Sequence, residues 1–179
     1  MKRILLWTTA RLPAREICGD HGEPYLERYY LFSLFGWRAY IHRFLASDPD
    51  RGLHDHPWGR SVSLMLAGGY FEQRILPHEF CGVRLVGLRL LSPGGFNVIR
   101  GDDFHRILLG PGQEAWTLFV HGPRVKGWGF LRDGVYSAFA TDKDDYPQQK
   151  WWKTAQSGRE LRTEQWRRIV LAAERNGSL

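Results

Sequence analysis

The stretch Arg51-Gly52-Leu53-His54-Asp55-His56-Pro57-Trp58 carries the densest chemical signal in the chain, because it holds two histidines separated by one residue in a segment that reads as extended. Successive side chains of a strand point to opposite faces, so the rings of His54 and His56 leave the same face and can converge on one metal ion. A His-x-His pair arises often by chance, and a metal site needs a further ligand from elsewhere in the fold. The meaning of this stretch therefore depends on a third ligand.

A third histidine, His105, lies in the segment 99–109, where a tight turn feeds an apolar strand. Gly101 and the two aspartates after it supply the turn chemistry, and the isoleucine and leucines after His105 supply the strand. His105 is therefore the predicted third ligand.

Two motifs built around these histidines resemble those of the cupin superfamily. The first family motif is a glycine, two histidines separated by one residue, a glutamate four or five positions on, and a closing glycine. The second is a Pro-x-Gly turn followed by a single histidine. The matching residues are Gly52, His54, His56 and Gly68 for the first motif, and Gly94, Gly101 and His105 for the second. The resemblance covers about residues 38–131 and implies a double-stranded β-helix, the jelly-roll barrel of the cupins.

The chain departs from the family at the glutamate, which falls at position 60 or 61, where this sequence has Arg60 and Ser61. In the second motif, Ile99 stands in place of the proline and Leu109 in place of an asparagine. The resemblance then implies a site of three histidines with no protein carboxylate, as in the thiol dioxygenase branch of the cupins. Neutral imidazoles suit several transition metals. The resemblance favours iron(II), with zinc, nickel and manganese as alternatives.

Short strands separated by Gly, Pro and Asp clusters dominate the middle of the chain, which is typical of a sandwich or barrel. The predicted strands are 29–34, 38–45, 60–66, 69–76, 83–91, 96–100, 105–109, 115–121 and 126–132. The tail differs, because apolar residues between Thr163 and Arg175 fall at helical spacing, with Thr163 as N-cap and Asn176-Gly177 as a stop signal. We therefore expect a mainly β protein with a C-terminal α-helix.

Three parts of one structural domain are expected. Residues 1–37 are an N-terminal extension that packs on the barrel, residues 38–140 form the cupin barrel, and residues 141–179 form a helical tail. The C-terminal helix is expected to pack on the outside of the barrel or against a second subunit. A homodimer is the expected assembly.

Two arginines, Arg60 and Arg106, are candidate catalytic residues that orient an anionic group of a substrate. If one strand runs unbroken from His54, the even positions face the interior. Arg60 then lies near the metal, where a guanidinium can hold a carboxylate by two hydrogen bonds. If residues 57–59 form a bulge, Ser61 faces inward instead. The sequence leaves both alternatives open.

Two further polar residues lie close to the motifs in sequence or at strand ends. Asp55 points away from the ligand face, either as an acceptor that fixes a neighbouring loop or a histidine tautomer, or as a simple turn residue. His121 ends a predicted strand, either as a further ligand or acid–base group, or as a polar residue near solvent. Both alternatives stay open in each case.

Strand phase leaves two other residues undecided. His42 shares a face with Tyr40 and Phe44, and that face points either inward or outward. Glu72 is a candidate for the missing carboxylate only if the Gly68-Gly69 turn does not interrupt the alternation.

Length, cysteines and hydropathy limit the class of protein. With 179 residues the chain is long enough to bury a core without disulfides. Only Cys18 and Cys81 are present, in no Cys-x-x-Cys arrangement, which is compatible with a reducing cytoplasm. The N-terminal apolar run is too short for a signal peptide, and no stretch approaches the ~20 apolar residues of a membrane span. We therefore expect a cytoplasmic protein with no membrane partner.

The net charge of +6 and the pI of about 9.6 raise the question of a nucleic-acid partner. The positive charges are scattered, and many alternate with acids, as in residues 159–164. No established nucleic-acid motif accompanies them. A solvated basic surface is therefore expected, with no nucleic-acid partner.

The leading functional prediction is a metal-dependent cupin that acts as a small-molecule oxygenase, with non-haem iron held by His54, His56 and His105. Its substrate is a small molecule, anionic if Arg60 or Arg106 orients it. One alternative is a non-catalytic, metal-dependent binding or sensor module. Another is a metal-free relative of the sugar epimerases and isomerases, which works by His and Tyr acid–base chemistry.

Overall fold

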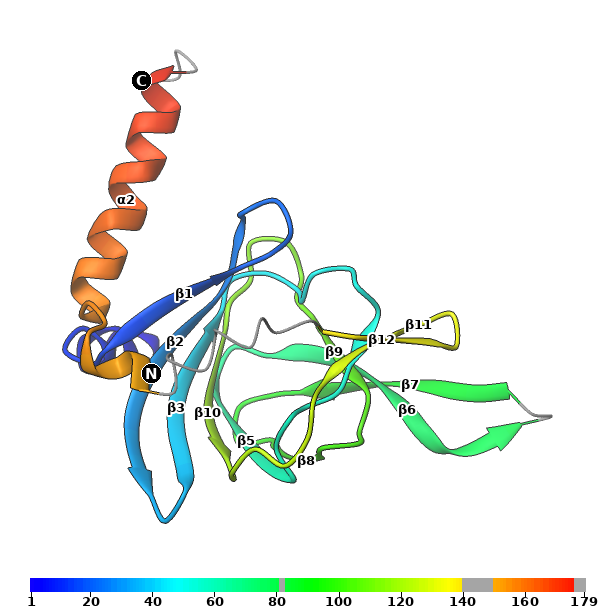
Figure 1. Ribbon diagram of the computed structural model, residues 1–179. Helices are drawn as coiled ribbons and strands as arrows, with labels where there is room; N and C mark the ends of the chain where they lie inside the picture. Colours follow the sequence, from blue (N-terminus) through cyan, green and yellow to red (C-terminus); the bar gives the residue numbers. More distant parts are fainter. Residues whose placement is uncertain (81–82, 140–149, 176–179) are drawn as a thin grey trace.

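Two antiparallel sheets of six strands each form the body of the protein (Figure 1). The computed structural model describes residues 1–80, 83–139 and 150–175. In spatial order, the first sheet contains β1 (Ala14–Cys18), β2 (Pro24–Leu34), β3 (Trp37–Phe44), β10 (Ala115–His121), β5 (Arg60–Ala67) and β8 (Phe96–Arg100). The second contains β12 (Val135–Ala138), β11 (Gly129–Arg132), β4 (Leu53–His54), β9 (His105–Leu108), β6 (Tyr70–Phe80) and β7 (Val83–Leu91). The helices α1 (Lys2–Thr9) and α2 (Gly158–Arg175) lie beside the first sheet (Figure 1).

Every strand that the sequence predicts is present, and so is the C-terminal helix. The mainly β class is therefore confirmed. The largest shifts are at the start of β2, which begins at Pro24, and at the end of β6, which ends at Phe80. The helix α1 and the strands β1 and β12 were not predicted, whereas β4 lies in the stretch around His54 that reads as extended.

From β3 onward the chain crosses repeatedly between the two sheets, and this places segments distant in sequence side by side. In the second sheet β4 lies between β9 and β11, so His54 is the register partner of His105. No strand pairing joins the two sheets within residues 1–80, 83–139 and 150–175. The body is therefore an open sandwich, and the closed barrel that the sequence predicts is wrong in this respect.

Residues 1–37 are more than an extension packed on a barrel, because β1 and β2 are strands of the first sheet. β2 pairs with β3 from Leu26 to Leu34. Alternation in β2 explains its place, since Leu26 faces the space between the sheets and Tyr29 faces the helices. The sequence-based division at residue 37 separates strands that pair with each other.

The core has two parts, one on each face of the first sheet. Between the sheets, Leu26 and Phe44 of the first sheet pack with Tyr70 and Ile107 of the second. On the other face, the first sheet packs against both helices, in a cluster of Leu5, Ala14, Tyr29, Ile41, Ala67, Trp116 and Leu161. Both faces of the first sheet are thus covered near its centre, and the space between the sheets is left to form the site.

The start of α2 is set by a capping box. Ser157 Oγ accepts a hydrogen bond from the Glu160 backbone N–H, and the Glu160 carboxylate accepts one from the Ser157 backbone N–H. The expected N-cap at Thr163 is therefore wrong, because the helix already begins at Gly158. The expected stop signal Asn176-Gly177 lies outside the described residues. Beyond its first turns α2 extends away from the sheets (Figure 1), and the homodimer stays a prediction.

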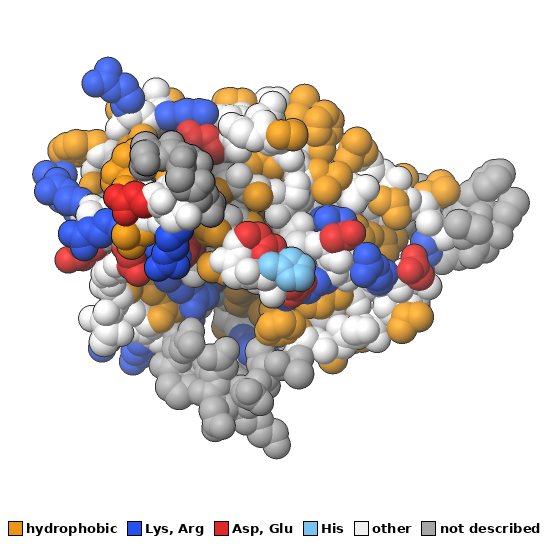
Figure 2. Space-filling view, turned by 90° about the horizontal axis from the view of Figure 1, so that it is seen from above, with side chains coloured by type: hydrophobic (Ala, Val, Ile, Leu, Met, Phe, Trp, Pro, Cys, Tyr) orange, Lys and Arg blue, Asp and Glu red, His pale blue; other side chains and the backbone are white. Residues whose placement is uncertain are grey.

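Within the described residues, no helix has both the length and the apolar character needed to cross a membrane. On the face seen in Figure 2, basic and acidic side chains are interspersed rather than gathered in one basic strip. This distribution agrees with the scattered charge of the sequence.

Candidate metal centre

The three histidines singled out by the sequence lie together in the space between the sheets. One ring nitrogen from each of His54, His56 and His105 lies within 4.8 Å of the others. His54 and His105 are cross-strand neighbours on β4 and β9, and the His56 backbone N–H donates to the Gly101 carbonyl. The Nε2 atoms of His56 and His105 are 2.7 Å apart. The predicted convergence of the three imidazoles is therefore confirmed.

Buried carboxylates lie on the outer sides of two of these rings, and one of them is at hydrogen-bond distance. The Nδ1 of His105 lies 2.7 Å from Oε1 of Glu72, and the same oxygen accepts a hydrogen bond from Asn97. The Nδ1 of His54 lies 3.8 Å from Oδ2 of Asp48, which also accepts the Ile107 backbone N–H at 2.8 Å. A carboxylate at hydrogen-bond distance from Nδ1, as Glu72 is from His105, favours the tautomer that carries its proton there, and this leaves the Nε2 lone pair free for a metal. Asp48 is too far from His54 for a hydrogen bond.

The environment keeps two of the ligand imidazoles neutral. Burial is the largest cause of the low pKa of His56, which lies well below its usual range, and the charges of neighbouring groups add to it. Burial also lowers the pKa of His105 well below its usual range, with contributions from His54 and Arg74. Metals bind the neutral imidazole, so both rings are in the ligand form at neutral pH.

The donor set fits a divalent transition metal. Two nitrogens that share a metal at about 2.1 Å are roughly 3 Å apart or slightly more, so the 2.7 Å between His56 and His105 needs only a small opening. Three neutral nitrogens suit zinc, copper, nickel and iron(II). Because the ligands themselves bring no negative charge, Glu72 and Asp48 are the carboxylates that lie nearest to balance the cation.

The three histidines line a cavity of about 710 Å³ between the sheets, within the range of small-molecule sites. Its walls are largely aromatic and aliphatic. The apolar residues that line it include Leu26, Phe44, Trp58, Ile107, Phe119, Trp128, Phe130 and Phe139. A largely apolar cavity with a cluster of nitrogen ligands on one wall is the arrangement of a small-molecule site rather than of a purely structural metal site.

Neither predicted arginine points into this cavity. Arg60 is exposed, and the buried residues of β5 are Ser61, Ser63, Met65 and Ala67. Of the two alternatives for this stretch, the structure has the one that turns Ser61 inward, and Arg60 lies outside the cavity. Trp58 still lines the cavity with His54 and His56, but β5 begins at Arg60 with Ser61 as its first buried residue, so the phase changes at Gly59.

Arg106 also lies outside the cavity. It alternates with His105 and Ile107 on β9, and its guanidinium pairs with Asp50 at 2.7 Å and bonds to the Asp48 carbonyl. A role at the metal for either arginine therefore finds no support in their positions.

The structure decides between the alternatives for Asp55 and Glu72. Asp55 is buried and accepts hydrogen bonds from the Gly129 backbone N–H at 2.6 Å and from Lys126. It therefore fixes the loop before β11, as one of its two readings expects. Glu72 faces the interior and bonds to His105, although the Gly68-Gly69 turn precedes it.

His42 and His121 are buried on the cavity side of the first sheet, outside the three-histidine cluster. The ring of His121 stacks on Trp58 at 4.0 Å, and burial lowers its pKa to about 4. The reading of His121 as a residue near solvent is thus wrong.

Sequence analysis missed Arg28, whose side chain lines the cavity. It lies on β2 directly opposite His42 on β3, and its Nε donates to Nε2 of His42 at 3.0 Å. The predicted strand 29–34 begins one residue after Arg28, whereas β2 begins at Pro24. A predicted strand that began at Tyr25 would have placed Arg28 on the same face as Leu26 and Tyr30, because alternate residues of a strand share a face.

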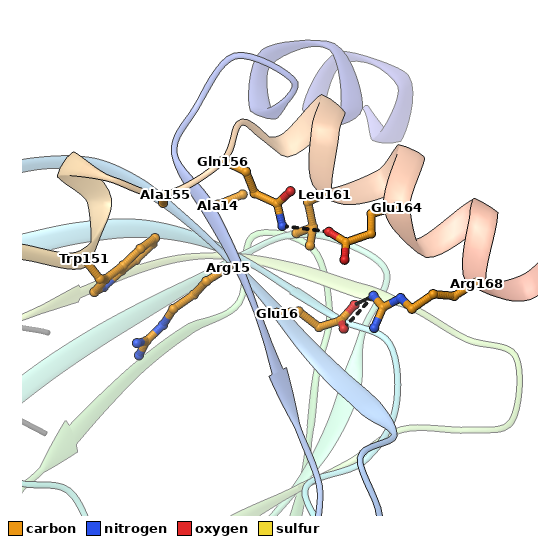
Figure 3. A pocket seen from close by; sticks show the side chains of 9 residues that line it. All are labelled: Ala14, Arg15, Glu16, Trp151, Ala155, Gln156, Leu161, Glu164 and Arg168. Atoms are coloured by element: carbon orange, nitrogen blue, oxygen red, sulfur yellow. Dashed lines mark hydrogen bonds and ion pairs between the residues drawn. The ribbon is translucent and has the colours of Figure 1, made fainter.

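A second, more open pocket of about 400 Å³ lies where α2 meets β1 (Figure 3). Glu16 pairs with Arg168 at 2.8 Å across it, and Gln156 bonds to Glu164. Figure 3 shows these side chains pointing toward one another. This pocket is therefore the contact region between α2 and β1, where an ion pair and hydrogen bonds hold the helix against the sheet.

Comparison with known proteins supports the fold and gives no evidence on the activity. No family model matches the sequence, and no curated protein matches it. Among solved structures, a cupin-2 domain from Rhodospirillum rubrum is 11% identical, with 68% of this chain and 76% of that chain covered and a TM-score of 0.53.

Two other solved structures have lower TM-scores. The Fe(II) form of HppE is 16% identical over 62% of this chain, with a TM-score of 0.47, and the match spans only 56% of the HppE chain. A structure described as a putative mannose-6-phosphate isomerase from Ralstonia eutropha is 16% identical over 57% of this chain and 88% of that chain, with a TM-score of 0.46. The likeness to the Rhodospirillum domain shows the fold alone: the chain has the cupin fold that its two motifs predict.

Proposed function

We propose that the protein is a metal-dependent enzyme that oxygenates a small molecule, with non-haem iron held by His54, His56 and His105. The observation that carries this proposal is the convergence of three ring nitrogens within 4.8 Å on the wall of a largely apolar cavity. Three ligands on one face leave the remaining coordination positions of a metal open toward the cavity. A structural site would instead be closed by a fourth protein ligand.

When bound, iron(II) supplies the activation of dioxygen, and the side chains of the chain do the rest. Glu72 holds the proton at Nδ1 of His105 and so fixes the ring with its Nε2 toward the metal position. Phe119, Trp128 and Phe130 line the cavity and limit the access of water, which protects a reactive centre from side reactions. Zinc, nickel or manganese would occupy the same ligands with a different chemistry.

The test combines metal analysis with oxygen uptake. Protein is purified without an affinity tag from iron-supplemented cells, and its metal content is measured by elemental analysis. Oxygen consumption is then followed on a panel of thiols, amino acids and aromatic acids, with the His105→Ala variant as the inactive reference. We expect about one iron per chain and oxygen uptake that depends on one class of substrate.

Each other outcome selects a different function. Stoichiometric metal without oxygen uptake across the panel would favour a binding or sensor module. Protein that stays free of metal after loading with iron or zinc would remove the oxygenase and leave the metal-free acid–base alternative.

A further inference from the structure

Arg28 is a guanidinium in the cavity whose partners do not neutralise its charge. Its Nε donates to the neutral ring of His42 at 3.0 Å, and its Cζ lies 5.4 Å above the ring of Tyr40. These are contacts with an imidazole and an aromatic face, not with a carboxylate. Among residues 1–80, 83–139 and 150–175, none forms an ion pair with Arg28.

Two other arginines, Arg43 and Arg51, do have carboxylate partners. Arg43 pairs with Glu27 and Glu114, and Arg51, which also lines the cavity, pairs with Asp20. Burying a guanidinium without an anion is costly, and burial lowers the pKa of Arg28 accordingly. Arg28 is therefore a cation in the cavity that could bind an anion from outside the chain.

The acids described along the cavity wall are engaged elsewhere. Glu16 bonds to Arg168 and Gln165, and Asp48 accepts the Ile107 backbone N–H beside His54. Neither forms an ion pair with Arg28. An anion that enters the cavity would thus meet a guanidinium with its two Nη atoms unbonded to any described residue.

Arg28 and the metal cluster occupy different walls of the same cavity. His42, the partner of Arg28, packs on Phe119 with ring centroids 4.8 Å apart, and Phe119 lies 6.5 Å from the ring of His56. The ring of Phe119 is therefore near both the partner of Arg28 and one of the ligand rings. A molecule held by Arg28 at one end would place its apolar body along this aromatic wall, toward the three histidines.

We infer that Arg28 is the specificity residue of this cavity and binds the oxyanion group of a small organic acid, a carboxylate or a phosphonate, whose apolar body lies against Phe119. The inference rests on the proposed function only in taking the cavity as the substrate site. Arg28 thus takes the role that the sequence predicts for Arg60 and Arg106, which lie outside the cavity: it binds the anionic group of the substrate. A planar fork of N–H donors matches both oxyanions, so the chemistry is shared between the two.

The test is calorimetric titration with three probes of similar size: phenylacetate, phenylphosphonate and the neutral phenylacetamide. Each is titrated into protein stripped of metal with EDTA and into the zinc-loaded protein. The stripped protein matters because an oxyanion can also coordinate a metal directly. In the stripped protein, a preference for anions has to come from the side chains.

We expect wild-type protein to bind at least one of the anions about tenfold or more tightly than phenylacetamide, since a charged hydrogen-bonded pair contributes about 1.5–3 kcal/mol. Arg28→Gln should bring that ratio close to one, and Arg28→Lys should keep part of it. Arg60→Gln is the matched control and should keep the wild-type ratio. The relative strength of the two anions decides between a carboxylate and a phosphonate.

Two results would overturn the inference: equal binding of anions and amide by the wild type, or an unchanged preference in folded Arg28→Gln. Thermal melting reports whether that variant folds, and Arg28→Lys provides the reading if it does not. Failure of the oxygenase proposal looks different, because oxygen uptake would be absent while the anion preference of the stripped protein persists. Conversely, oxygen uptake on a neutral substrate alone would keep the enzyme and remove the role of Arg28.

Discussion

The carboxylate of Glu72 lies 2.7 Å from Nδ1 of His105, on the side of the imidazole opposite to the nitrogen that faces His56. The cupin motif places a glutamate among the ligands, at a position where this chain has Arg60 and Ser61. Here a carboxylate from β6 contacts a ligand from outside instead. The negative charge is thus one hydrogen bond away from the metal position, behind His105 rather than on the metal itself.

Replacing Glu72 by glutamine should weaken metal binding by about 10- to 100-fold, because the amide removes the charge that favours the Nδ1–H tautomer of His105. The measurement is competition for zinc against a chelator of known affinity. Asp50→Asn is the control, since Asp50 is an exposed carboxylate that pairs with Arg106 outside the cavity. Equal affinities of Glu72→Gln and wild type would show that this contact does not tune the site.

Replacing any one of His54, His56 or His105 by alanine should weaken binding more than the loss of the Glu72 contact does, because a ligand is removed and not its support. The same chelator competition measures it. His121→Ala should bind zinc like the wild type, as His121 lies outside the cluster. If His121→Ala loses the metal and His105→Ala keeps it, the assignment of the third ligand is wrong.

The strands and the three histidines could be predicted from the sequence because both depend on short-range pattern. Alternating apolar residues define a strand locally, and His54 and His56 share one stretch of chain. The strand phase after Pro57 could not be predicted, because it depends on whether the chain restarts its pairing, which is decided by neighbours from distant segments. The sequence therefore leaves open whether Arg60 or Ser61 faces the cavity.

The contacts that complete the site join residues far apart in the chain. Glu72 reaches His105 across β6 and β9, and Arg28 reaches His42 across β2 and β3. No local pattern marks a buried carboxylate or guanidinium in advance, because the same residue types are ordinary on a solvated face. Only the topology shows which of them are inside.

Replacing Asp55 by alanine should lower the free energy of unfolding by about 1–3 kcal/mol, because the buried Gly129 backbone N–H loses its acceptor. Replacing its other partner, Lys126, by methionine should cost less than about 1 kcal/mol, since that side chain is 32% exposed and its ion pairs are screened. Urea unfolding measures both. The reverse order would mean that the ion pair, rather than the backbone bond, fixes the loop before β11.

Replacing Gly52 by alanine should destabilise the protein more than replacing Gly36 does. Both have positive φ angles, of 95° and 81°, which cost an L-residue about 1 kcal/mol. A Cβ on Gly52 would also overlap the Leu131 carbonyl on β11, whereas Gly36 has open space. We therefore expect a larger loss for Gly52→Ala, together with weaker zinc binding, because β4 carries His54. Equal losses in the two variants would show that β4 can shift without cost.

Stability should fall as the pH drops below about 6.5, and His121 offers the cleanest way to show it. Burial lowers its folded-state pKa to about 4, whereas the unfolded chain titrates near 6.5. Between these values the unfolded state binds the extra proton, so acid favours unfolding by up to about 1.4 kcal/mol per pH unit for this one group.

Above about pH 6.5 the histidine is neutral in both states, and the effect vanishes. His42, whose pKa burial also lowers, acts in the same direction. The variant His121→Phe keeps a ring against Trp58 and removes the titrating group, so its stability should depend less steeply on pH between 4 and 6.5. The measurement is urea unfolding with EDTA present. EDTA removes any bound metal, so that metal and protons do not compete for the ligand histidines. The control variant replaces the exposed residue His21 by alanine and reports the effect of removing a histidine from the surface. An identical slope in His121→Phe and wild type would mean that His121 can take up its proton in the folded protein, and that the wall behind Trp58 admits water.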